Sequence, residues 1–139
     1  MTSERRAPGG RLIALVLLAF FFIAAGTNHF VHPGVYVRTV PPWLPAPALL
    51  VQISGICEIL GGIGVLLPTA RRFSGAALIA LLIAVFPANV QMALHPEDYA
   101  DIASAPAFYI RLPLQIVLIA WVWWICIAGT RNLYCRNLR

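Results

Sequence analysis

The sequence has no lysine and little charge of either sign. All ten basic residues are arginine, five residues are acidic, and the formal net charge is +5. Charged residues make up 11% of the 139 and hydrophobic residues 60%, whereas soluble domains average about 25% and about 45–50%. This composition, with a mean hydropathy of +0.82, excludes a water-soluble enzyme, a disordered segment and a nucleic-acid-binding domain.

Cysteine is also scarce. Cys57, Cys126 and Cys135 form no C-x-x-C motif, and an odd number of cysteines cannot close a disulfide framework. A thiol–disulfide membrane enzyme needs a paired dithiol with one activated sulfur. We therefore expect buried, unreactive cysteines and no thiol redox chemistry.

Long apolar runs dominate the rest of the chain, at about 12–31, 48–67, 73–94 and 110–129. A helix of about 20 residues crosses the hydrocarbon core of a bilayer, which is about 30 Å thick. The first run continues past the small residues that could form a signal-peptide cleavage site, so we expect it to remain as a helix. The sequence thus predicts one all-α domain over residues 1–139, a four-helix transmembrane bundle embedded in lipid.

The connections between the runs carry the topology signal. The first, 32–47, holds five prolines around Trp43, which argues against a regular helix there. The second, 68–72, is a tight turn between antiparallel neighbours. Eight arginines lie in the head, the second connection and the tail, whereas Arg38 and Arg111 lie on the other side. The positive-inside rule then predicts cytoplasmic termini. We expect a multi-pass protein of a bacterial-type plasma (inner) membrane.

Polar side chains within the runs lie toward the side opposite the termini. Such groups are costly in lipid and usually face the bundle interior or a cavity. Glu58 shares a helix face with Gly55 and Gly62, and small residues mark close helix contact. We expect a common cavity, although polar groups that only fix helix packing remain an alternative. The candidate ligand-binding residues are Asn28, His29, Glu58, Asn89, Arg111 and Gln115.

Other features carry weaker signals. The acidic loop His95-Pro96-Glu97-Asp98, with Asp101, lacks metal-site spacing, so we expect a solvated loop and no metal ion. Pro87 is expected to kink the third helix. The sequence offers no nucleophile–base pair, so we assign no catalytic residue.

Four segments together resemble the DoxX-like family of small membrane proteins. They are AGTNHFVHP (25–33), ISGICEILGGIGVLLP (53–68), PANVQMALH (87–95) and RLPLQIVLIAW (111–121). The resemblance implies a four-helix bundle with both termini inside. It places the glutamate of the family's second helix at Glu58, the arginine of its fourth helix at Arg111, and its Asn-His pair at Asn28 and His29.

The family includes a subunit of a thiosulfate:quinone oxidoreductase, a component of methylamine utilisation and members linked to redox-stress complexes. The resemblance therefore predicts an accessory or assembly subunit of a membrane redox system, not catalytic on its own, that docks a membrane protein partner or a second copy. The alternative is a binding protein or oxidoreductase for a small quinone-like molecule. In that alternative Glu58 accepts a proton, and His29 and Arg111 anchor the ligand.

Overall fold

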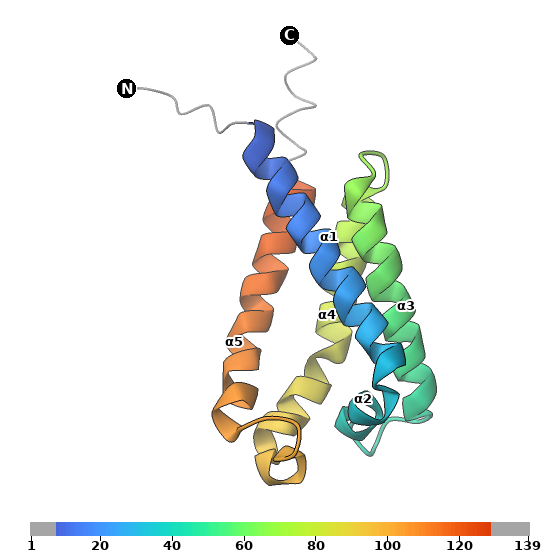
Figure 1. Cartoon of the computed structure of the whole chain (residues 1–139), viewed down its shortest axis with the longest axis vertical. Helices are drawn as coiled ribbons and strands as arrows, with labels where there is room; N and C mark the ends of the chain where they lie inside the picture. The colour runs from blue at the N-terminus through green and yellow to red at the C-terminus, as the bar shows by residue number, and fades with distance from the viewer. Residues whose placement is uncertain (1–7, 129–139) are drawn as a thin grey trace.

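The computed structural model describes residues 8–128, and this part of the chain is helical without strands. The described chain forms four long helices and three short elements, and Figure 1 shows how the helices are arranged. The long helices are α1 (Pro8–Val31), α3 (Pro47–Leu66), α4 (Arg71–Leu94) and α5 (Ala105–Val122). The short elements are the helix α2 (Pro33–Thr39), the 3-10 turn η1 (Pro96–Tyr99) and the π-helical turn η2 (Trp123–Ala128), which continues α5.

Four segments are long and apolar enough to cross a membrane: Gly9–Val31, Pro47–Leu66, Arg71–Leu94 and Ala105–Ala128. This finding confirms the all-α bundle with four membrane-spanning helices, and it makes the chain a multi-pass membrane protein. The last helix begins five residues earlier than expected. Ser104 is extended at its N-cap and Pro106 lies in the first turn, where the fixed φ of proline suits a helix start.

The first connection contains a helix, and the expectation that its prolines exclude one was wrong. Pro33 lies in the first turn of α2, where its missing N–H leaves no hydrogen bond unmade. The helix ends at Thr39, before Pro41 and Pro42. Proline therefore bounds this helix instead of preventing it.

The long helices pack in the order α1, α3, α4 and α5. The described chain begins and ends at the same end of the bundle, which we call the closed end. There α1 also contacts η2. Arg11 Nη2 donates a hydrogen bond of 3.0 Å to the Ile125 carbonyl. Toward the other end, which we call the α2 end, α1 and α5 diverge (Figure 1). The larger apolar core cluster lies toward the closed end, at Leu15, Leu18, Ala19, Phe22, Val65, Leu78, Leu82, Val122, Ile125 and Cys126. A smaller cluster lies toward the α2 end, at Met92, Ala93, Tyr99 and Phe108.

Glycines bring α1 and α3 unusually close. A Cβ atom added to Gly26 would lie 2.5 Å from the Gly55 carbonyl oxygen, and one added to Gly62 would lie 3.0 Å from the Ala19 carbonyl oxygen. Gly55, Glu58 and Gly62 are all buried, so they do share an inward face as predicted. This close approach determines the geometry of the polar groups between the two helices.

Candidate functional site

Two titratable side chains face each other between α1 and α3. The Nδ1 atom of His29 lies 3.5 Å from the Oε2 atom of Glu58, and the two residues are only 9% and 8% exposed. Neither atom has a hydrogen-bond partner. An unpaired buried polar atom costs about 1–3 kcal/mol, so a hydrogen bond between these two groups would stabilise the contact of α1 with α3.

The short helix α2 covers this pair at the α2 end. The ring of Tyr36 lies 3.9 Å from the His29 ring, centroid to centroid, at an interplanar angle of 62°. Asn28 Nδ2 donates a hydrogen bond of 2.8 Å to the Tyr36 hydroxyl. Tyr36 therefore joins the candidate residues, although the sequence placed it in a connection where no helix was expected.

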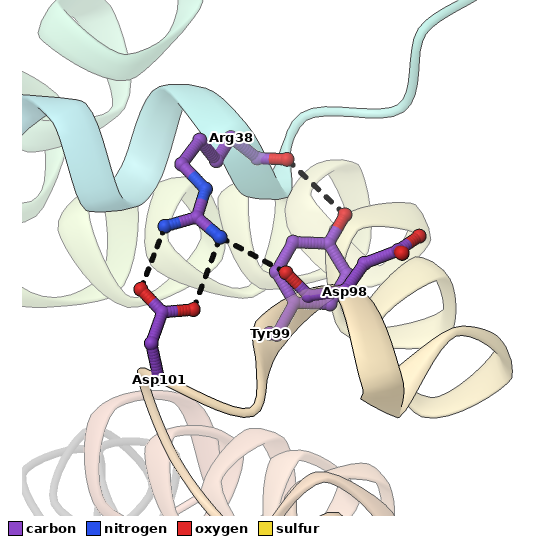
Figure 2. A network of polar contacts seen from close by, with 4 residues as sticks. All are labelled: Arg38, Asp98, Tyr99 and Asp101. Atoms are coloured by element: carbon purple, nitrogen blue, oxygen red, sulfur yellow. Dashed lines mark hydrogen bonds and ion pairs between the residues drawn. The ribbon is translucent and has the colours of Figure 1, made fainter.

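An ion pair ties α2 to the connection between α4 and α5 (Figure 2). Arg38 donates to both carboxylate oxygens of Asp101, at 2.8 and 3.1 Å, and to the Asp98 carbonyl at 2.9 Å. In return, the Tyr99 hydroxyl donates to the Arg38 carbonyl at 3.1 Å. The four hydrogen bonds hold α2 in the position that covers His29.

The electrostatics of this ion pair agree with its geometry. The Arg38 guanidinium holds the pKa of the Asp101 carboxyl below its usual range, mainly through the hydrogen bond between them, and Asp101 raises the pKa of Arg38. Asp101 is exposed, as expected for a solvated acidic loop, and the ion pair with Arg38 is a contact that the sequence did not predict. His95, Glu97 and Asp98 have ligand atoms within 4.8 Å of one another, but all three are exposed, and exposed acidic groups commonly gather without an ion.

A second polar group lies between α4 and α5. Asn89 Nδ2 donates to Gln115 Oε1 at 2.7 Å, and Gln115 Nε2 donates to the Leu82 carbonyl. Pro87 lies inside α4 and has no N–H for the carbonyl one turn earlier. The carbonyl that loses its usual donor is that of Ile83, and the Gln115 side chain donates to the carbonyl of the neighbouring residue, Leu82.

Arg111 lies nearby on α5 and is exposed. Its Nη1 atom is 3.7 Å from the Met92 sulfur, and its Cζ atom is 5.7 Å from the Phe108 ring centroid. Within residues 8–128, no carboxylate forms an ion pair with Arg111. The contacts of the six candidates therefore form two groups, one between α1, α2 and α3 and one between α4 and α5, instead of the single cavity that we expected.

Two cavities open on the helix surfaces. A groove of about 610 Å³ between α1 and α5, the α1–α5 groove, is lined by Leu17, Phe20, Phe21, Ala24, Ala25, Asn28 and Trp121. A smaller one of about 220 Å³, the α4–α5 cavity, is lined by Ile83, Phe86, Gln115, Ile116 and Ile119. Neither of these two cavities is lined by His29 or Glu58.

Comparison with known proteins gives a family without an assigned activity. No curated protein and no solved structure matches the chain. One family model, described as a domain of unknown function (DUF8561), matches residues 18–126. The matched segment includes all six candidate residues, both buried polar groups and most of each long helix. Because the match covers well over half of the sequence, the chain belongs to the DUF8561 family.

Proposed function

We propose that this chain is a DoxX-like accessory or assembly subunit of a membrane redox system. In this proposal it lies in the bacterial plasma membrane with both termini in the cytoplasm and docks a membrane protein partner. The resemblance of four segments to DoxX-like proteins supports the redox setting, and the arginine distribution supports the orientation. The four spanning helices supply the membrane location.

The observation that carries the docking role is the α1–α5 groove. Helices associate in lipid through close van der Waals packing, and small residues allow that approach. Ala24 and Ala25 offer such a surface beside Phe20, which is 71% exposed. The His29–Glu58 pair, by contrast, is covered by α2 and lines neither cavity. A partner helix seated along α1 therefore suits the geometry better than a substrate held at Glu58.

Co-purification in a mild detergent tests this proposal. We expect the wild-type chain to be recovered with a membrane subunit of a redox enzyme. Ala24→Trp fills the α1–α5 groove and should lower the recovered partner at least tenfold. Ala80→Trp is the matched control, because it makes the same change at an exposed position of α4 outside the groove. It should leave the complex intact.

Two results contradict the docking role. One is wild-type protein that purifies without any redox subunit, and the other is a complex that survives Ala24→Trp as well as it survives Ala80→Trp. Both variants should be compared at equal amounts of folded protein, judged by size-exclusion profile. A loss of the partner from both variants would show that the effect comes from general bundle packing. It would also contradict docking at the α1–α5 groove.

The second candidate function is the binding of a small quinone-like molecule at Glu58. It is favoured by one observation, the two unpaired buried atoms that face each other from His29 and Glu58. Native mass spectrometry of wild type beside Glu58→Gln tests it, since the glutamine keeps the size of the side chain and removes its titration. An adduct on wild type alone would support the site. Bare protein in both samples would refute it.

A further inference from the structure

The guanidinium of Arg111 lies near the membrane boundary at the α2 end. It contacts Met92, which is two residues from the last residue of α4, Leu94. The Cα of Arg111 is six residues into α5, or about 9 Å from the helix start at 1.5 Å per residue. A long side chain that starts at this depth can direct its charge to the headgroup level.

The contacts of Arg111 within the chain leave most of its hydrogen-bonding capacity unused. A guanidinium has five N–H donors, and a thioether sulfur is a weak acceptor. The Met92 sulfur and the Phe108 ring stabilise the cation but supply no negative charge. The other arginine at this end within residues 8–128, Arg38, has Asp101 as its partner, whereas Arg111 has no carboxylate partner in that range.

The α4–α5 cavity begins about one helical turn below Arg111 on α5. Gln115 and Ile119 line it one and two turns below Arg111, so it extends over about 6 Å of the helix at 1.5 Å per residue. Its walls include Ile83 and Ile116, which are 60% and 64% exposed and therefore face lipid. A chain-like apolar group can enter it sideways from the bilayer.

The polar side chain that lines the α4–α5 cavity, Gln115, already makes hydrogen bonds within the chain. Gln115 accepts from Asn89 and donates to the Leu82 carbonyl. The other four lining residues are apolar, namely Ile83, Phe86, Ile116 and Ile119. The cavity thus offers contact surface for a hydrocarbon chain, and Arg111 lies about one helical turn above it on α5.

We propose that Arg111 and the α4–α5 cavity form a binding site for one anionic phospholipid. The phosphate accepts hydrogen bonds from the Arg111 guanidinium, and an acyl chain runs along Phe86, Ile116 and Ile119. Arginine suits this role because its planar N–H donors pair with phosphate oxygens. Basic groups between transmembrane helices are known to bind anionic headgroups. A soluble anion would use the arginine alone and would leave the apolar cavity without a role.

Native mass spectrometry tests this site directly. The full chain is released from nanodiscs made of equal parts phosphatidylglycerol and phosphatidylcholine, and the lipid that remains bound is counted. We expect one phosphatidylglycerol per chain on the wild type. Arg111→Gln should lower its retention about tenfold or more, because the bond lost is one to a charged group. Arg72→Gln changes an exposed arginine at the closed end and should retain the lipid.

A second variant separates the cavity from the charge. Ile119→Trp fills the cavity while keeping Arg111, and we expect it to lower retention as well. Equal retention of phosphatidylglycerol by wild type, Arg111→Gln and Ile119→Trp would overturn the proposal, as would equal retention of the two lipids by the wild type. Displacement of the lipid by inorganic phosphate would also overturn it, because the site would then recognise a soluble anion.

Discussion

His29 and Glu58 face each other across the contact of α1 with α3, with 3.5 Å between Nδ1 and Oε2. Tyr36 lies over the imidazole from the α2 side, and the neighbouring glycines let the two helix backbones approach. The pair therefore lies among three helices and lines neither of the two cavities. Its two groups depend on each other, because within residues 8–128 neither His29 Nδ1 nor Glu58 Oε2 has a hydrogen-bond partner elsewhere.

This dependence predicts strong coupling between the two residues. His29→Leu or Glu58→Leu alone removes one group and leaves the other buried without a partner, which should cost about 1–3 kcal/mol of unfolding free energy. The double variant removes both and should cost clearly less than the sum, with a coupling of roughly 0.6–1.7 kcal/mol. Unfolding of the four proteins in mild detergent measures it. Additive effects would show that the two groups do not interact.

The glycines between α1 and α3 give a second prediction. In Gly26→Ala the new Cβ would lie 2.5 Å from the Gly55 carbonyl oxygen, which is backbone and cannot rotate away. The two helices must then separate, at a cost of about 1–3 kcal/mol. Gly34→Ala in α2 is the control, because nothing lies within 4 Å of its added Cβ. We expect a lower unfolding midpoint for Gly26→Ala only. Equal midpoints would mean that the contact relaxes freely.

Much of the fold could be predicted because apolar run length and glycine spacing are local signals. The four spans and the inward face of Glu58 follow from residues that lie within one helix. The short helix α2 could not be predicted from proline content alone, since proline at Pro33 starts a helix and later prolines only end it. Position within a helix, not the number of prolines, decides the effect.

The grouping of the candidate residues depends on which helices are neighbours, and sequence spacing does not contain that information. Glu58 and Arg111 were both expected at one cavity, yet α3 packs on α1 and α4 whereas α5 packs on α4. The pairing of Arg38 with Asp101 joins residues that are 63 positions apart. In the sequence, only the opposite charges of the first and third connections indicated this pairing, because both connections lie at the same end of the bundle.

The Arg38–Asp101 ion pair predicts an acid-sensitive position for α2. Folding lowers the pKa of Asp101, so its contribution is present above the ordinary aspartate range and is lost as the pH falls through the lowered pKa. We expect the protection factors of the α2 amides, which correct for the intrinsic pH dependence of hydrogen exchange, to be high at pH 7 and to fall at acidic pH as Asp101 is protonated. Asp101→Asn should show low protection factors at both pH values. The same protection in wild type and Asp101→Asn at pH 7 would contradict the role of this ion pair.

The arginine distribution predicts the orientation of the bundle, and cysteine labelling can test it. Arg11, Arg71 and Arg72 lie at the closed end, and that end should face the cytoplasm because arginines are retained there. Thr69, in the exposed turn between α3 and α4, and Glu97, in the exposed η1 turn, mark the two ends. We expect an impermeant maleimide to label Glu97→Cys in intact spheroplasts and Thr69→Cys only after lysis. Both changes are made after the native cysteines are replaced by serine, and the reverse labelling pattern would place the closed end outside.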